Sequence, residues 1–227
     1  MSGFSEEWND TYSERPRLTS WPWSDLVSLV YRYCKDIDNN DKEICVFELG
    51  CGAGPNIPFF KSLNVKYFGV EGSRLIVDSL HKKFPELSKQ VVVGDFTDKS
   101  IYKSFNGLDI IVDRASVTHN DVFAINKTLE YSFKALKKGG IYIGIDWFST
   151  KHSDFSLGKE ANDKYTKTDI ETGNFRGVGN VHFSNEEHIR ELFTSFEIIS
   201  LEEKVIYNFQ DFSGHQFASW NIVAIKR

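Results

Sequence analysis

The sequence has little cysteine: Cys34, Cys45 and Cys51 are its three among 227 residues. Their spacing matches no paired metal-binding motif and they cannot all pair with one another, which excludes a disulfide framework and favours a reducing compartment. No apolar run reaches the roughly 18 residues of a membrane span, and the N-terminal residues lack the basic then apolar pattern of a signal peptide. We therefore expect a cytoplasmic protein without a membrane partner.

The sequence also lacks an excess of basic residues. Its net charge is −5 and its pI about 5.7, with lysine and arginine scattered along the chain, so nucleic acid is a poor candidate partner and a small-molecule substrate is favoured. A length of 227 residues with 41% hydrophobic content suits one α/β domain over residues 1–227. The sequence does not indicate an oligomeric state.

The most informative segment is a short apolar run, residues 44–47, followed by Glu48 and three alternating glycines, Gly50, Gly52 and Gly54. The run predicts a buried parallel strand, and the glycines allow a sharp turn with close approach of the backbone to a ligand. A dinucleotide fingerprint would place its third glycine where this chain has Pro55. The turn therefore predicts a cofactor site that differs from a dinucleotide site.

Acidic residues follow the ends of the later predicted strands. Glu71 lies 21 residues after Gly50, close to the roughly 20-residue interval of an acid that binds a ribose diol. Asp95 and Phe96 end the next apolar run, where a carboxylate and a ring could hold an adenine. Asp113 and then Asp146 end two further strands.

Predicted strands and helices alternate regularly, which indicates a parallel sheet. Strands are expected near 44–48, 67–71, 90–94, 108–112 and 141–146, with helices near 56–63, 74–84 and 98–104. Asn120 is expected to cap the helix that follows it, and Ser184 to open a capping box for another. Residues 148–183 break the pattern and are expected to form a functional loop, before a final pair of strands separated by a turn at 211–214.

Together, the acid and glycines of residues 48–54 and the final strand pair resemble class I S-adenosylmethionine-dependent methyltransferases, whose signature is E/D-x-G-x-G-x-G. The resemblance implies an α/β, Rossmann-like, seven-stranded and mostly parallel sheet of order 3-2-1-4-5-7-6 with the last strand antiparallel and helices on both faces. It divides the chain into a lead and helix (1–43), a cofactor-binding core (44–147), an insertion or lid (148–183) and a C-terminal helix and strand pair (184–227).

By this resemblance the cofactor is S-adenosylmethionine, converted to S-adenosylhomocysteine. The residues expected to contact it are Tyr12, Glu48, Gly50, Gly52, Gly54, Glu71, Gly72, Ser73, Asp95, Phe96 and Asp113.

Methyl transfer to an alcohol requires removal of its proton, for which histidine suits neutral pH. His119, just beyond the predicted strand 108–112, is the first candidate for the base, and His152, after the strand 141–146, is the second. Asp113 and Asp146 together would suggest a metal as in catechol-type methyltransferases, but Trp147 stands where those enzymes have asparagine. We expect no metal.

The residues after the strand 108–112 read DRAS, which lacks the N/D-P-P-Y/F of enzymes that methylate exocyclic or amide nitrogens. Segments 146–154 and 181–193 look like small-molecule methyltransferases of sugar or surface-glycan biosynthesis, which favours O-methylation of a sugar or phosphorylated metabolite. Three alternatives remain: a small-molecule N-methyltransferase, an NAD(P)-dependent oxidoreductase, and a non-catalytic adenosylmethionine-binding protein.

Overall fold

The computed structural model describes residues 3, 7–8, 19–39, 41–105, 107–210 and 214–227. The core elements in chain order are α2 (Ser24–Tyr33), β1 (Cys45–Leu49), α3 (Ile57–Ser62), β2 (Lys66–Glu71), α4 (Arg74–Lys83), η1 (Pro85–Leu87), β3 (Val91–Val93), η2 (Lys99–Tyr102), β4 (Leu108–Arg114), η3 (Val117–His119), α5 (Val122–Ala135) and β5 (Leu136–Phe148). They are followed by η4 (Ser153–Ser156), β6 (Lys159–Glu160), β7 (Thr166–Thr168), β8 (Val181–His182), α6 (Glu186–Leu192), β9 (Glu197–Tyr207) and β10 (Gln216–Ile225).

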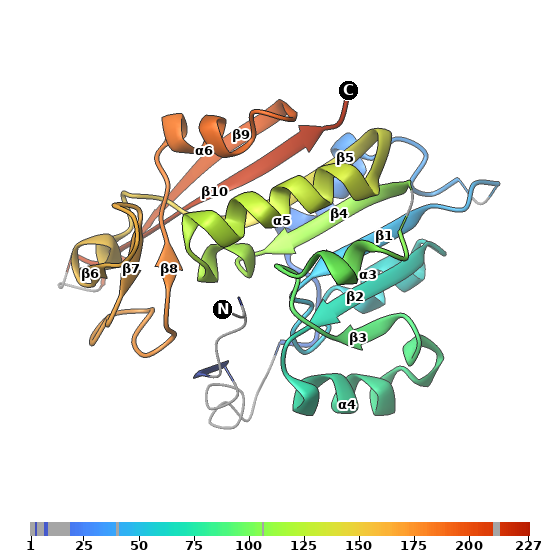
Figure 1. The fold of residues 1–227 in the computed structure, drawn as a ribbon, viewed down its shortest axis with the longest axis horizontal. Helices are drawn as coiled ribbons and strands as arrows, with labels where there is room; N and C mark the ends of the chain where they lie inside the picture. The colour runs from blue at the N-terminus through green and yellow to red at the C-terminus, as the bar shows by residue number, and fades with distance from the viewer. Residues whose placement is uncertain (1–2, 4–6, 9–18, 40, 106, 211–213) are drawn as a thin grey trace.

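Seven strands form the central sheet in the order β3-β2-β1-β4-β5-β10-β9 (Figure 1). The first five pair in parallel, whereas β10 is antiparallel to both β5 and β9. The predicted α/β, Rossmann-like sheet is confirmed. The strand numbering differs from the predicted one because three short strands, β6 to β8, come between β5 and β9.

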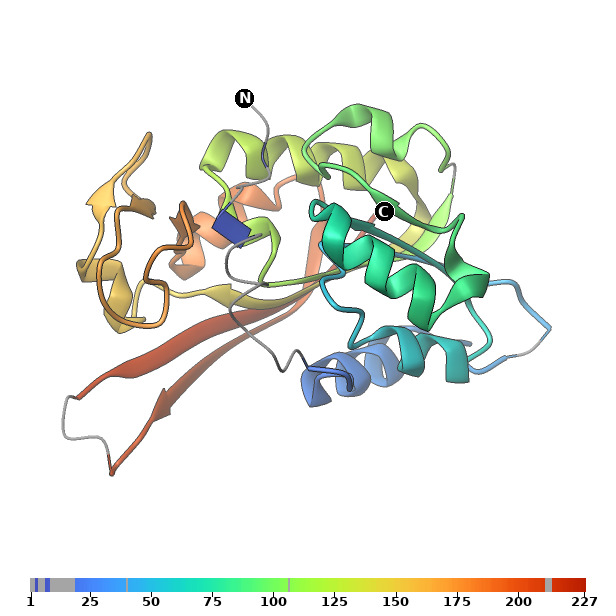
Figure 2. The same ribbon diagram turned by 90° about the horizontal axis from the view of Figure 1, so that it is seen from below.

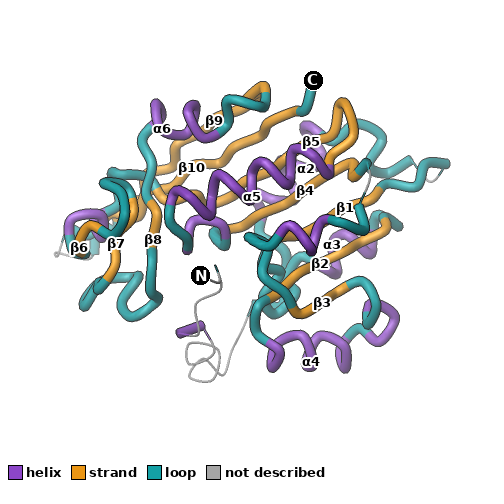
Figure 3. The backbone as a smooth tube through the Cα atoms, viewed as in Figure 1, coloured by secondary structure: helices purple, strands orange, loops and turns teal. Residues whose placement is uncertain are grey.

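Both faces of the sheet are covered, and each strand contributes alternate side chains to the two faces. Val46 of β1 and Ile110 of β4 pack in one apolar cluster with α2, α3 and α4. Phe47 and Ile111, the next residues, pack in a second cluster with α5 and α6. Figure 2 shows α5 and α2 on opposite sides of the sheet, and Figure 3 distinguishes the helices from the strands by colour. Among the described helices none is long and apolar enough to cross a membrane.

The segment between β5 and α6 is more regular than the sequence predicted. Its strands form a separate three-stranded sheet, β6-β7-β8. A third apolar cluster, which includes Phe148, Phe175 and Phe183, packs beneath it. The sequence pattern of this segment did not show these strands because they are two or three residues long, too short for an alternating pattern.

Candidate functional site

A cavity of about 360 Å³ lies at the carboxyl ends of the parallel strands. This is where open α/β sheets hold ligands, and the volume falls in the range of roughly 300–1,000 Å³ found for small-molecule sites. Eight of the residues predicted from the sequence line it: Glu48, Gly50, Gly52, Glu71, Gly72, Asp95, Phe96 and His119. The structure thus brings the ends of β1, β2, β3 and β4 together around one space.

The turn after β1 has the left-handed backbone that its glycines were expected to allow, with φ of +66° at Gly50 and +51° at Gly52. A Cβ added at Gly50 would lie 2.5 Å from the Cβ of Ser116, so only glycine fits there. Gly54 has a different role. It does not line the cavity, and a Cβ there would meet Ile57 and Leu80 at 2.7 Å, so Gly54 serves packing beneath the turn.

Most N–H groups of this turn are already donated within the protein. Cys51 N–H donates to Val70 O at 3.0 Å, and Gly54 N–H donates to Cys51 O at 3.0 Å. Gly52 N–H donates to Glu71 Oε2 at 3.0 Å. Pro55 has no N–H to offer. The turn therefore presents few donors to an anion.

Glu71, at the end of β2, connects the glycine turn to the next helix. Its Oε2 accepts the Gly52 N–H and its Oε1 accepts the Ser73 N–H at 2.9 Å. The side chain is only 4% exposed, and burial raises the pKa of Glu71. Ser73 itself does not line the cavity; it is the buried residue before α4. A carboxylate has about four acceptor positions, so the hydrogen bonds to the backbone leave Glu71 with capacity to bind a ligand.

Glu48 holds the base of the same turn. Its Oε1 accepts from Asn56 Nδ2 at 2.7 Å and its Oε2 from the Tyr67 hydroxyl at 2.6 Å. Burial raises the pKa of Glu48 to about 7. The carboxyl group thus links β1, β2 and the segment before α3.

Asp95 lies on the cavity wall after β3. Its Oδ1 accepts from both the N–H and the hydroxyl of Thr97 at 2.8 Å, and its Oδ2 accepts from the Gly3 N–H at 2.6 Å. Gly3 and Trp8 also line the cavity, so the N-terminal segment contributes to this wall. Tyr12 lies outside the described residues.

Asp113 is turned away from the cavity, contrary to what its position at a strand end suggested. It is fully buried: Oδ1 accepts from the N–H groups of Ser116 and Val117 at 3.0 Å, and Oδ2 accepts from the Trp147 indole at 2.6 Å. Burial raises the pKa of Asp113. The geometry gives Asp113 a structural role.

His119 lies in the cavity wall between aromatic rings. Its ring centroid is 4.8 Å from that of Trp8 and 5.5 Å from that of Phe148, both edge-on. Nδ1 lies 3.3 Å from Asn180 O, which can only accept, so in this contact Nδ1 carries the hydrogen and Nε2 the lone pair. Burial lowers the pKa of His119 to about 4, which keeps the ring neutral near pH 7.

His152, the second candidate base, does not line the cavity. It is 2% exposed and lies behind the aromatic rings of Phe175 and Phe217, with centroid distances of 4.8 and 5.1 Å. It belongs to a separate cluster with Asp154 and His215.

Two adjacent strand ends in the cavity wall carry strained backbone. Ala115 and Asp146 have φ of +53° and +54°, an uncommon conformation for residues other than glycine that often marks functional sites. Asp146 Oδ2 accepts from Arg114 Nε at 3.1 Å, and its Oδ1 accepts from Lys204 Nζ at 2.6 Å. Arg114 in turn stacks on the ring of Trp23 at 3.6 Å.

The sequence did not predict this part of the cavity wall. Arg114 carried a signal, since it directly follows Asp113 at the end of a strand. Phe175 and Phe217 come from distant segments and gave no local signal.

Acidic side chains predominate in the lining of the cavity. Its described lining residues include four acids, Glu48, Glu71, Asp95 and Asp146. Among the same residues, Arg114 is the only lysine or arginine. Asp146 is paired with Arg114 and Lys204, and burial raises the pKa of Glu48 and of Glu71. The lining therefore disfavours an anionic ligand more than it supplies free negative charge.

Comparisons with known proteins agree on the fold. Neither protein-family models nor curated proteins gave a match to the sequence. A solved S-adenosylmethionine-dependent methyltransferase of Methanosarcina mazei is 18% identical with a TM-score of 0.65, over 92% of this chain and 99% of that chain. A solved S-adenosylmethionine-dependent methyltransferase of Anabaena variabilis is 17% identical with a TM-score of 0.67. The match covers 98% of this chain and 93% of that chain.

A third similar structure is the geranyl diphosphate C-methyltransferase of Streptomyces coelicolor, solved with Mg²⁺, geranyl diphosphate and S-adenosyl-L-homocysteine. It is 12% identical with a TM-score of 0.61, over 90% of this chain and 80% of that chain. The chain therefore has the fold of S-adenosylmethionine-dependent methyltransferases.

Proposed function

We propose that the protein is an S-adenosylmethionine-dependent methyltransferase that methylates a hydroxyl group of a small acceptor. The observation that carries the proposal is Glu71: its carboxylate accepts the N–H groups of Gly52 and Ser73 and lines the cavity beside the glycine turn. A carboxylate can accept hydrogen bonds from both hydroxyls of a ribose diol.

The charge and hydrogen bonding of the cavity favour this cofactor over NAD(P). A pyrophosphate needs free N–H groups at a helix N-terminus, whereas the N–H groups of Cys51, Gly52 and Gly54 are already donated and Pro55 has none. S-adenosylmethionine carries a positive sulfonium, which suits a wall containing four carboxyl groups. When bound, it supplies an activated methyl group.

Asp95 and Phe96 suit the adenine end of the cofactor, and the opposite end of the cavity suits the acceptor. Trp23, Phe148, Phe175 and Phe217 also line the cavity, and we expect the acceptor to bind against these rings and the amide of Asn174. Aromatic walls with few polar groups are typical of small-ligand sites. Residues 148–183, which supply Phe148, Phe175 and Asn174, would cover the acceptor and exclude water.

We expect His119, which lines the cavity, to take the acceptor's proton at Nε2. With a pKa of about 4 it is a weak base toward a free alcohol. An alcohol oxygen becomes strongly acidic as its bond to the methyl group forms, so a weak base in the correct position is sufficient late in the reaction. The Asn180 carbonyl fixes the ring through Nδ1.

The test has two stages. Calorimetric titration with S-adenosylmethionine, S-adenosylhomocysteine, NADH and NADPH should show binding of the first two alone. Sugars, sugar phosphates, nucleotide sugars and small alcohols and amines are then screened for formation of S-adenosylhomocysteine. Tighter binding of NAD(P)H would contradict the proposal, and methylation of amines alone would overturn the choice of oxygen. Cofactor binding without turnover on any compound would favour a non-catalytic binding protein.

A further inference from the structure

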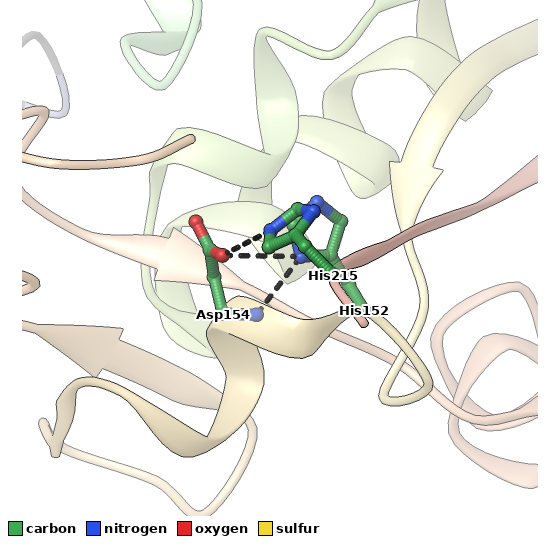
Figure 4. A group of neighbouring side chains, drawn as sticks. All are labelled: His152, Asp154 and His215. Carbon is green, nitrogen blue, oxygen red and sulfur yellow. Dashed lines mark hydrogen bonds and ion pairs between the residues drawn. The ribbon is translucent and has the colours of Figure 1, made fainter. Parts of the chain in front are cut away.

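Three side chains from two separate segments point toward one another (Figure 4). His152 precedes η4, Asp154 lies within it, and His215 immediately precedes β10. One ring nitrogen of each histidine and one carboxylate oxygen of Asp154 lie within 4.8 Å of one another. We propose that His152, Asp154 and His215 form a binding site for a divalent transition-metal ion of the Zn²⁺ type.

Two of the three distances between the ligand atoms are close to those expected around a single ion. Asp154 Oδ1 is 2.8 Å from His215 Nε2 and 3.7 Å from His152 Nδ1. Ligands at about 2.1 Å from a tetrahedral Zn²⁺ are separated by about 3.4 Å, which lies between these two values. Binding would replace the hydrogen bond that the Asp154 N–H now donates to His152 Nδ1.

The carboxylate of Asp154 is fully buried, and a bound cation would stabilise its negative charge. It is 0% exposed, and among the described residues only the two histidines form ion pairs with it. Its Oδ2 accepts the Phe175 N–H at 2.9 Å. Gly173, with φ of +83°, allows the chain to pass so close that a Cβ there would lie 2.5 Å from Oδ1. An ionised carboxylate in such a place is costly unless it is paired or binds a metal.

The ligand set selects the class of ion. Two imidazoles and one carboxylate suit Zn²⁺ and its transition-metal neighbours, whereas Mg²⁺ prefers oxygen ligands alone. Three protein ligands leave a coordination position open, and His215 is the partly exposed member through which the ion can enter.

The metal would join parts of the fold that are far apart in sequence. His152 packs on Phe175 and Phe217, both of which line the cavity. An ion shared with His215 would hold the start of β10 against η4 and keep these two rings in place. The expected role is to order the acceptor wall, and this role replaces that of a second base for His152.

The site is tested by titrating tag-free, full-length protein with Zn²⁺ against a chromophoric chelator. Wild-type protein should bind one equivalent, with a rise in Tm, and Co²⁺ should give the visible absorption of a tetrahedral site. Mg²⁺ should not compete. His215→Ala and Asp154→Asn should weaken Zn²⁺ binding by more than the roughly 10- to 100-fold that loss of an outer-shell partner costs.

His188→Ala is the matched control, because His188 and His182 form the other histidine pair, with Nε2 atoms 3.0 Å apart. This variant should keep the metal affinity of wild type. If Asp154→Asn does not fold, the partly exposed His215→Ala still decides the outcome, with circular dichroism as the check on folding. Wild-type protein that binds no Zn²⁺, or equal affinity in His215→Ala, would overturn the proposal, as would loss of binding in His188→Ala alone.

Discussion

Replacing Glu71 with alanine should remove the expected hydrogen bonds to the ribose hydroxyls while leaving the sheet intact. The carboxylate lies at the end of β2, where it accepts the N–H groups of Gly52 and Ser73, and we expect its remaining acceptor capacity to bind both ribose hydroxyls. Two hydrogen bonds to a charged acceptor contribute about 1.5–3 kcal/mol each. The lower limit of about 3 kcal/mol corresponds to a loss of affinity of roughly 100-fold or more.

Calorimetric titration with S-adenosylhomocysteine measures this loss directly. The matched control is Glu86→Ala, because Glu86 is an exposed acid that pairs with Lys61 away from the cavity. Thermal unfolding of each variant separates a folding defect from a binding defect. If folded Glu71→Ala binds within threefold of wild type, the assignment of Glu71 to the ribose is refuted.

Three further predictions address turnover, stability and pH. His119→Ala should lower the rate of S-adenosylhomocysteine formation by about 10²- to 10⁴-fold with cofactor affinity within threefold; a loss below tenfold contradicts its role as base. Asp113→Asn should place an amide against the Trp147 indole and backbone donors and cost about 3 kcal/mol, seen by calorimetry as a Tm lower by roughly 6–12 °C. Unchanged Tm would contradict its structural role. Burial lowers the pKa of His182 from 6.5 to about 4. As the pH falls below 6.5, His182 therefore takes up a proton in the unfolded chain before it does so in the folded protein. The free energy of unfolding should decrease between pH 6.5 and pH 4, by up to about 3 kcal/mol. Urea unfolding of wild type and His182→Asn at several pH values measures this pH dependence. If the free energy of unfolding changes with pH in the same way in both proteins, the role of His182 is contradicted.

The sequence was informative where the fold follows from local rules. The glycine turn and the acids Glu71 and Asp95 were found because strand, turn and helix follow one another in a fixed order, and parallel strands end at one edge of the sheet. These residues line the cavity in the structure. Their contacts with a cofactor stay a prediction.

Helix starts were correct to within one residue. The cap of α5 is Asp121, whose side chain accepts the Ala124 N–H, and not Asn120. The cap of α6 is Asn185, whose side chain accepts the His188 N–H, and not Ser184. Neighbouring residues with equal capping ability cannot be distinguished without the three-dimensional context.

Side-chain direction could not be predicted at other positions. Asp113 ends its strand as Glu71 does, yet it points to the Trp147 indole, a partner 34 residues away. His152 lies behind the aromatic wall because of contacts with rings from two other segments. Such contacts depend on tertiary packing, which overrides local pattern.

A crystal structure of the protein with S-adenosylhomocysteine tests the central claim most directly. We expect the ribose hydroxyls within hydrogen-bond distance of both Glu71 oxygens, the adenine between Asp95 and Phe96, and the sulfur facing His119. An empty cavity at saturating ligand, or a nucleoside bound without contact to Glu71, would contradict the proposed function.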